Sequence, residues 1–358
     1  MKGVRAGSQP GREIRWRSRI AFLVVLVGTA LLATETATWA LFRWPQVWLG
    51  RIPAGPQTYL IGFYNEFFRG PHLQFRPDCY EPDPELLYRP KQGRCRFATS
   101  EFDTEVRTSA RHLREDVGTN RPDIVFLGDS YTLGWGVERE EAYPGLLAKR
   151  LGIEETVVAA SSYGTVRELL LLRRAALDDF GVVILQYSRN DVNENVDFVK
   201  MGRHVPTPAS TYQASLDITR RIYEKSLFKR SRHWLSVARA RFFPVGPAFP
   251  PPTSIEGHAR SLLVVLGEFA PDLKGRPVLI FAEEFGAAER AFVQAVNDLP
   301  RAAGLGPVRA IEAMTHLSQS DHYQMDVHWK ASGHTVVADV LARELAEFVP
   351  GLTPRKGR

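Results

Sequence analysis

The sequence predicts an α/β fold, a three-layer α/β/α sandwich with a mainly parallel five-stranded sheet, preceded by an N-terminal transmembrane helix. Two observations predict it. A long apolar run follows a basic N-terminus, and from Pro122 onward short apolar segments alternate with helical ones. Continuously apolar strands that alternate with helices are typical of a parallel sheet covered on both faces. With 44% hydrophobic and 24% charged residues the composition is that of a globular protein, which excludes disorder, collagen and coiled coil.

The N-terminal segment has the pattern of a membrane anchor. The apolar run 20–44 contains only two charges, Glu35 and Arg43, and its first 22 residues can cross roughly 30 Å of hydrocarbon. The cations before it predict that the basic tail 1–19 lies in the cytoplasm and the rest of the chain outside it. Two alternatives stay open, a signal peptide cleaved after Ala40 and a buried core helix.

The net charge of +6 is concentrated at the two ends of the chain. Residues 1–19 carry +5 and the basic tail 351–358 carries +3, so the residues between them carry −2. A nearly neutral body argues against a nucleic-acid-binding protein.

Two cysteines lie in the Pro-rich segment after the anchor, which we interpret as an irregular extracytoplasmic extension at 45–118 with one strand at 101–108. Cys79 and Cys95 are 16 residues apart in the sequence. In an oxidising compartment a disulfide is the leading interpretation, and two unpaired thiols are the alternative. No His or Cys cluster with the spacing of metal ligands accompanies them, so we expect no metal.

The main domain is expected at 119–350. Its predicted strands are 123–130, 156–162, 181–188, 276–283 and 307–313, and its predicted helices are 140–152, 166–181, 287–299 and 331–348. Between the third and fourth strands lies a helical insertion at about 192–275, far longer than a crossover needs. It is interpreted as a lid over a binding cleft, as a basic surface that contacts a membrane, or as a solvated surface helix.

Polar residues follow the strands at the sheet edge where α/β proteins place their sites. Ser130 stands in a Gly-Asp-Ser turn, Asn190 follows the third strand, and Asp326 and His328 precede the last helix. A carboxylate beside a histidine can orient the imidazole that activates a serine, and a carboxamide can donate to an oxyanion. Taken singly, each is better explained as a turn, a cap or a structural histidine.

Together these segments resemble the SGNH (GDSL-like) hydrolase family over about residues 122–348. The matching blocks are GDSYTLGWGV at 128–137, SRND at 188–191 and DVHWKASGH at 326–334, with the serine first as in the esterase-type members. The resemblance implies a flavodoxin-like SGNH fold with Ser130 as nucleophile, His328 as base and Asp326 as its orienter. It also implies that Asn190 and the Ser130 N–H are oxyanion donors.

The second block departs from the family pattern. The family usually has a glycine after the second strand, whose N–H completes the oxyanion hole, whereas this chain reads AASSYGT at 159–165. Either Ser162 or Gly164 is expected to supply that N–H. The Asp-x-His spacing is one residue shorter than the common form.

The resemblance implies a serine esterase, and the basic N-terminus with the apolar run after it predicts a bacterial protein that is anchored in the inner membrane by one helix, with its catalytic domain in the periplasm. It would hydrolyse a carboxylic ester through an acyl-enzyme, without a metal or an organic cofactor. An O-acetyl group on an envelope glycan, a lipid ester and a thioester all fit as substrate. The alternatives are an O-acyltransferase on a cell-envelope polysaccharide that uses the same triad, and a catalytically silent envelope scaffold.

Overall fold

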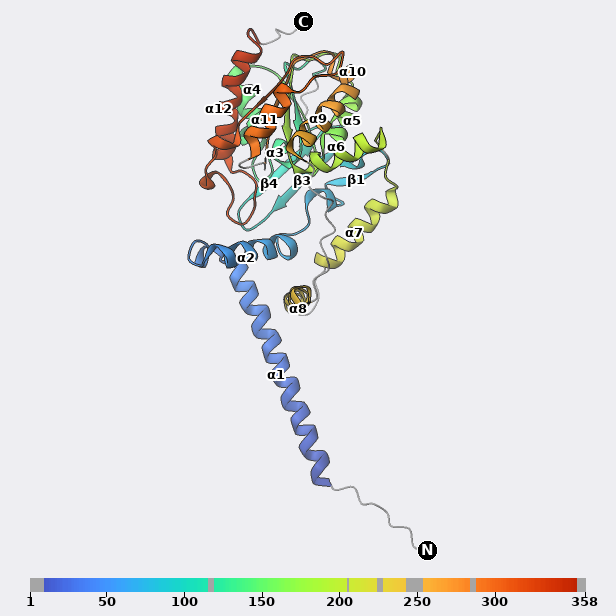
Figure 1. Ribbon diagram of the computed structural model, residues 1–358. Helices are drawn as coiled ribbons and strands as arrows, with labels where there is room; N and C mark the ends of the chain where they lie inside the picture. Colours follow the sequence, from blue (N-terminus) through green and yellow to red (C-terminus); the bar gives the residue numbers. More distant parts are fainter. Residues whose placement is uncertain are drawn as a thin grey trace. The chain divides into compact units, whose positions relative to one another are not determined.

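The computed structural model describes residues 10–114, 119–204, 206–223, 228–242, 254–283 and 288–352. The chain divides into two compact units, whose elements are labelled in Figure 1. The helical unit comprises Met1–Phe68 and Tyr223–Phe249, and the sheet unit comprises Arg69–Ile222 and Pro250–Arg358. Parts of the two predicted basic tails, 1–9 and 353–358, lie outside the described residues.

Five parallel strands form the centre of the sheet unit, in the order β6-β5-β7-β8-β9. They are β5 (Ile124–Gly128), β6 (Glu155–Ala159), β7 (Val182–Tyr187), β8 (Val278–Ala282) and β9 (Val308–Ile311). All strand residues except Arg309 are buried, because helices cover both faces. The predicted fold class is confirmed.

Helices cover the sheet in two layers. They are α3 (Ser130–Leu133), α4 (Tyr143–Leu151), α5 (Thr165–Ala175), α6 (Arg189–Met201), α9 (Ile255–Glu268), α10 (Ala270–Leu273), α11 (Glu289–Asp298) and α12 (Ala331–Phe348). Helix α7 (Ala209–Tyr223) follows α6 in the insertion, and of its residues Tyr212 is buried. In one layer α4 packs against α12, and in the other α9 packs against α6 and α11 (Figure 1). The order of the strands places a switch point between β5 and β7, where sheets of this kind open a crevice.

One helix is shorter than its pattern predicted. The helix expected at 166–181 is α5, which ends at Ala175 and is followed by Ala176 in the left-handed conformation. Gly181 instead lies against the backbone of Asp123, where a Cβ would come within 2.4 Å of the Asp123 carbonyl oxygen. A glycine is needed at this position because two backbones approach each other closely beside the sheet, and not because a helix ends there.

The segment 69–114 lies in the part of the chain, 45–118, that was expected to be an irregular extension. It contains regular strands instead, and it belongs to the sheet unit. It forms two antiparallel hairpins, β1 (Tyr80–Asp83) with β2 (Leu87–Pro90) and β3 (Gly93–Ala98) with β4 (Asp103–Thr108). Only β4 was anticipated from the alternating pattern. Short 3-10 turns occur at η2 (Leu73–Phe75), η3 (Arg139–Glu141), η5 (Met314–His316) and η6 (Gln319–Asp321).

The helical unit contains the N-terminal apolar helix. Its elements are α1 (Pro10–Arg43), η1 (Pro45–Val47), α2 (Ala54–Phe67) and α8 (Lys229–Phe242). Within α1, Trp16–Arg43 is long and apolar enough to cross a membrane, a property that signal sequences share. The stretch of the insertion that reads as one helical run in the sequence forms two helices, α7 and α8, with residues 224–227 outside the described part.

Candidate active site

Ser130 lies at the carboxyl end of β5, next to the central strand β7, as its position in the sequence predicted. Asp129 caps the short helix α3 by accepting the Tyr131 N–H at 3.0 Å, which sets the turn that presents Ser130. Gly128 precedes it, and a Cβ there would lie 2.8 Å from the Cβ of Thr132 on α3. The strand end therefore delivers a serine side chain to the switch point of the sheet.

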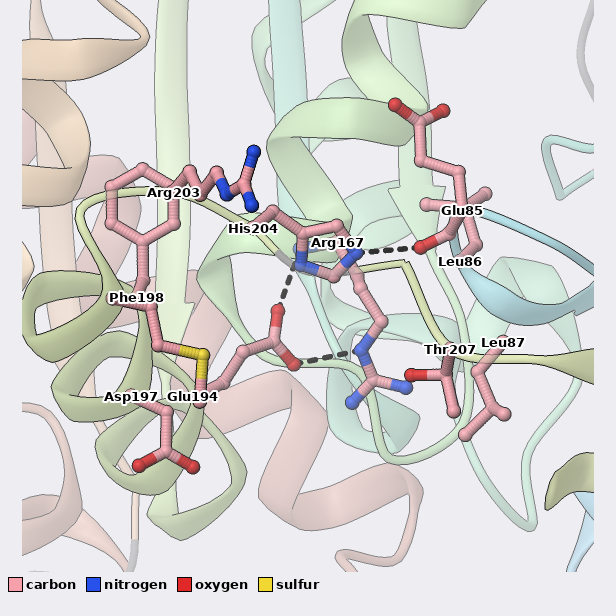
Figure 2. Close-up of a pocket in the computed structure, with 11 residues that line it drawn as sticks. Glu85, Leu86, Leu87, Arg167, Glu194, Asp197, Phe198, Arg203, His204 and Thr207 are labelled. Atoms are coloured by element: carbon pink, nitrogen blue, oxygen red, sulfur yellow. Dashed lines mark hydrogen bonds and ion pairs between the residues drawn. The ribbon is translucent and has the colours of Figure 1, made fainter.

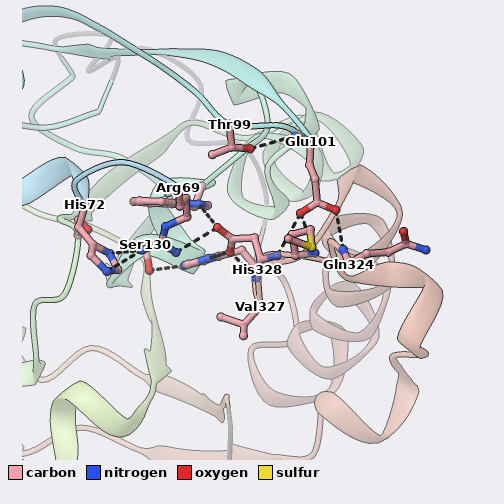
Figure 3. A network of polar contacts seen from close by, with 12 residues as sticks. Arg69, His72, Thr99, Glu101, Ser130, Gln324, Val327 and His328 are labelled. Atoms are coloured by element: carbon pink, nitrogen blue, oxygen red, sulfur yellow. Dashed lines mark hydrogen bonds and ion pairs between the residues drawn. The ribbon is translucent and has the colours of Figure 1, made fainter. Parts of the chain in front are cut away.

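Ser130, His328 and Asp326 form a continuous hydrogen-bonded chain (Figure 3). His328 Nε2 lies 2.8 Å from Ser130 Oγ, and His328 Nδ1 lies 2.5 Å from Asp326 Oδ1. Although burial alone would raise it, the charges of His328 and Arg69 hold the pKa of Asp326 well below its usual range. An ionised Asp326 accepts from Nδ1–H, which leaves Nε2 to accept the serine proton.

Two further side chains reach the other oxygen of Asp326. Arg69 Nη1 and Trp135 Nε1 each lie 3.2 Å from Asp326 Oδ2, and the Arg69 side chain is 6% exposed. The Trp135 ring also stacks on His328 with 4.9 Å between ring centroids. Asp326 is thus held at both oxygens, and the imidazole plane is fixed by an aromatic face as well as by its hydrogen bonds.

A carboxylate from the β3–β4 turn holds the loop that carries the Asp–His pair. Glu101 accepts three backbone N–H groups, from Gln324 at 2.7 Å, Met325 at 2.9 Å and Asp326 at 3.0 Å (Figure 3). Burial raises the pKa of Glu101, and the three N–H donors oppose that shift. A single side chain therefore fixes the backbone that carries Asp326.

Asn190 lies at the first turn of α6, directly after β7, and its amide is oriented by a buried acid. Asn190 Nδ2 donates to Asp129 Oδ2 at 2.7 Å, and the same oxygen accepts from Ser188 Oγ at 3.0 Å. Burial raises the pKa of Asp129, while bonds from Tyr131, Ser188 and Asn190 lower it. An amide nitrogen carries two hydrogens, so one can bond Asp129 while the other faces a substrate.

The loop of the second block distinguishes Ser162 from Gly164. The Gly164 N–H donates to Glu194 Oε2 at 3.2 Å, so it already has a partner. Ser162 has a φ of 59°, which lies in the left-handed region that favours glycine. Glycine is the usual residue at this point in the family that the chain resembles. Among the described residues, its N–H makes no hydrogen bond. The geometry favours Ser162 as the second backbone donor.

Residues of the segment 69–114 hold this loop too. Tyr80 Oη accepts the Ser161 N–H and Tyr88 Oη donates to the Ser161 carbonyl, both at 2.9 Å. The Gln74 amide accepts from Ser161 Oγ at 2.7 Å and donates to Ser162 Oγ at 3.0 Å. These hydrogen bonds hold Ser161 and Ser162 in place, although the backbone conformation of Ser162 is unfavourable for a residue with a side chain.

The two cysteines join the parts of the segment that make these contacts. Cys79 and Cys95 form a disulfide with 5.1 Å between their Cα atoms. Cys79 precedes Tyr80, and Cys95 lies on β3, the strand that leads to Glu101. The bridge therefore links the hairpin that contacts the second block to the hairpin that contacts the Asp–His loop.

A cavity of about 270 Å³ lies along α6 (Figure 2). Glu194 and Phe198 line it, one and two turns beyond Asn190 on the same helix. The half-buried Arg167 pairs with Glu194 at 2.7 Å, and His204 contacts the Glu85 carbonyl oxygen at 2.6 Å. Carboxylates, cations and an aromatic ring thus surround one hollow next to the helix that carries Asn190.

Over the described residues, no group of three or more His, Cys, Asp or Glu side chains could hold a metal ion.

The sequence blocks located Ser130, Asn190, Asp326 and His328, and the structure brings these four residues to one edge of the sheet. Sequence reasoning missed Arg69, Gln74 and Glu101, together with the roles of Tyr80, Tyr88 and Trp135. Trp135 stands inside the first quoted block, so its position next to the serine was a usable signal. The others lie in the segment 69–114, where no spacing relates them to the catalytic residues.

Comparisons with known proteins give structural similarity alone. No family model and no curated protein matches the chain. Among solved structures it is similar to a carbohydrate esterase family 2 enzyme from Corynascus thermopiles (Myceliophthora fergusii), with 15% identity, a TM-score of 0.38, and coverage of 63% of this chain and 66% of that one. An acetyl xylan esterase from the rumen bacterium Butyrivibrio proteoclasticus shows 12% identity, a TM-score of 0.37 and coverage of 65% of each chain.

A third similar structure is a salicylyl-acyltransferase from a tetracycline biosynthetic pathway, with 16% identity, a TM-score of 0.38, and coverage of 69% of this chain and 62% of that one. The matches span less than two thirds of the length of each of these three proteins. At such identities and TM-scores the similarities carry no functional argument. The function is therefore inferred from the geometry of the chain's own residues.

Proposed function

We propose that the protein is a serine esterase that hydrolyses a carboxylic ester through an acyl-enzyme. The observation that carries the proposal is the chain from Ser130 Oγ through the His328 imidazole to Asp326, with 2.8 Å and 2.5 Å between its members. Nucleophile, base and orienter lie within hydrogen-bond reach, which is the geometric requirement for this chemistry. A silent scaffold has no need of this arrangement.

The first half of the reaction forms the acyl-enzyme. Ser130 Oγ attacks the ester carbonyl carbon while His328 Nε2 takes the hydroxyl proton, and the carbonyl oxygen becomes an oxyanion. The N–H groups of Ser130 and Ser162 and the Asn190 amide donate to that oxyanion. The carbon–oxygen bond to the alcohol then breaks, and His328 returns its proton to the leaving alkoxide.

The second half reverses these roles. A water molecule gives a proton to His328 Nε2 and attacks the acyl carbon, and the new oxyanion meets the same donors. The bond to Ser130 Oγ breaks, Oγ takes the proton back from His328, and the carboxylic acid leaves. If a second hydroxyl compound replaces the water, the same steps transfer the acyl group, which is the transferase alternative.

The part of the substrate beyond the ester is assigned to the cavity along α6. Phe198 offers an apolar face there, and the charged groups of Asp197 and Arg203 offer hydrogen bonds. A hydroxyl-rich ring with apolar faces, as in an acetylated glycan, meets both requirements. A long acyl chain would find too many charged neighbours in the same hollow.

The proposed location is the extracytoplasmic side of a membrane, with α1 as an uncleaved anchor. Its support is the apolar stretch Trp16–Arg43 together with the cations that precede it. The disulfide between Cys79 and Cys95 fits an oxidising compartment.

The test is covalent labelling of the full-length protein in detergent by a fluorophosphonate, combined with turnover of a small activated acetyl ester. The wild type is expected to be labelled and active. The Ser130→Ala variant is expected to lose both, while Ser215→Ala, which removes an exposed serine hydroxyl on α7, keeps both. Labelling that persists in Ser130→Ala would overturn the nucleophile assignment. An unlabelled, inactive wild type would favour the scaffold.

Acetylated glycans and short acyl esters, each supplied with and without a sugar acceptor, then separate the substrate classes. Hydrolysis releases acid at the same rate with or without the acceptor. A transferase instead releases little acid and moves the acyl group to the added sugar.

A further inference from the structure

Helix α8 is held by hydrogen bonds and an ion pair to the C-terminal half of the apolar helix α1. Glu35 on α1 accepts the Ser231 N–H at 2.8 Å and pairs with Arg230 at 3.3 Å. Trp234 Nε1 donates to Thr38 Oγ1 at 2.9 Å. Glu35, the carboxylate that is costly within an apolar helix, therefore finds its charge partner and its N–H donor on α8.

Aromatic contacts with α2 fix the same helix from a second side. The Trp234 ring stacks on Phe63 with 4.1 Å between centroids, and the His233 ring stacks on Phe67 with 4.2 Å. Phe63, Phe67 and His233 are buried. Because α1 and α2 both hold α8, its position along α1 is defined within the helical unit.

With α1 as the proposed anchor, these contacts lie within about 8 Å of the outer edge of the hydrocarbon layer. Glu35 and Thr38 lie eight and five residues before the end of α1 at Arg43, or roughly 12 and 8 Å at 1.5 Å per residue. A hydrocarbon layer of about 30 Å that begins after Arg19 ends near residue 40. From Ile20 to Val27, α1 carries seven large exposed apolar side chains, all of them before Leu31, whose carbonyl oxygen accepts from Ser231 Oγ on α8 at 3.3 Å: Ile20, Phe22, Leu23, Val24, Val25, Leu26 and Val27.

The composition of α8 suits an interface between hydrocarbon and anionic headgroups. Its sequence, KRSRHWLSVARARF, carries five Lys or Arg and no Asp or Glu. Arg232 and Arg239 are exposed, and Leu235 is 66% exposed. Arg side chains can extend to phosphate groups while an apolar side chain enters the acyl region.

We propose that α8 is a second membrane-binding element, which lies in the outer interface of the bilayer and binds the headgroups of anionic phospholipids. The proposal rests on the membrane anchoring of α1 proposed above. Because α8 lies within the long insertion at about 192–275, this insertion would then supply a lipid-binding helix.

The test uses the full-length protein in nanodiscs, with nitroxide labels on single introduced cysteines. Cys79 and Cys95 are paired and do not compete for the label. Leu235→Cys reports on α8, Leu26→Cys reports on the anchor, and Val264→Cys on α9 is an exposed control in the sheet unit. Collision rates with oxygen, which partitions into lipid, and with a water-soluble nickel chelate are compared for each label.

In discs that contain phosphatidylglycerol, the label at 235 is expected to collide several-fold more often with oxygen than with the nickel chelate, and the label at 264 the reverse. In discs of phosphatidylcholine alone, or in the Arg232→Glu, Arg239→Glu variant, the preference at 235 is expected to fall. A water-like label at 235 beside a lipid-exposed label at 26 overturns the role of α8 and leaves the anchor intact. A label at 26 that is water-like overturns the anchoring itself. Equal burial at 235 in neutral and anionic discs overturns the headgroup assignment.

Discussion

Two regions of the sheet unit contribute to the candidate site in different ways. The five-stranded domain supplies the reacting atoms, on Ser130 after β5 and on His328 before α12. The segment 69–114 supplies side chains that hold the two loops next to them, Glu101 at the Asp–His loop and Gln74 at the second block. The reacting groups thus follow from the topology of the sheet, and their orientation follows from a segment outside it.

The largest expected effect comes from the base. His328→Gln should lower kcat by about 10⁴–10⁶-fold, because the side chain can no longer take the proton from Ser130. The matched control is His334 in the same sequence block, which is buried, accepts the Tyr143 N–H at 3.3 Å and has a pKa lowered to about 3 by burial. His334→Gln should lower the Tm and leave kcat per folded molecule within a few-fold. The assignment fails if the two variants show the opposite pattern.

The next effect separates the oxyanion donor from a loop cap. Asn190→Ala should lower kcat by about 10²–10³-fold with little change in KM, because this hydrogen bond is made mainly in the transition state. Its bond to Asp129 is lost as well, so the Tm is measured with the kinetics. A normal kcat with a lowered Tm would show that Asn190 only caps α6.

The third effect tests the orienting region directly. Glu101→Gln replaces an acceptor of three N–H groups by a side chain with one oxygen, so the loop that carries Asp326 should shift, and kcat should fall about 10- to 100-fold. Glu105→Gln, on the outer side of the same hairpin, should leave kcat unchanged. A positioning role also predicts a residual rate that keeps the wild-type KM. If kcat stays normal while the Tm falls, Glu101 contributes to stability alone.

The fold and the reacting residues could be predicted from the sequence for a physical reason. Parallel strands end at one edge of a sheet, so Ser130 and Asn190, each placed after an apolar strand, had to lie near each other. Arg69 and Glu101 could not be predicted in the same way. They contact Asp326 across 257 and 225 residues of sequence, and neither stands at a repeating position of a helix or strand.

The smallest expected effect concerns the backbone of Ser162. An L side chain at a φ of 59° costs about 1–2 kcal/mol, whereas glycine adopts this conformation freely and loses roughly 0.5–1 kcal/mol through its more flexible unfolded chain. Ser162→Gly and Ser162→Ala both lose the bond from Gln74, and only the glycine variant relieves the strain. Ser162→Gly should therefore be more stable to unfolding than Ser162→Ala by about 1 kcal/mol.

The same pair of variants tests the assignment of the second oxyanion donor. Both retain the backbone N–H at 162, so kcat should stay within a few-fold of the wild type in each. Urea unfolding and turnover of an activated acetyl ester are measured on the two variants side by side. A tenfold loss of kcat in both would show that the Ser162 hydroxyl, or its hydrogen bond from Gln74, is needed for the reaction and that the backbone N–H alone does not suffice. Equal stabilities would show that the segment 69–114 does not hold residue 162 in a strained conformation in solution.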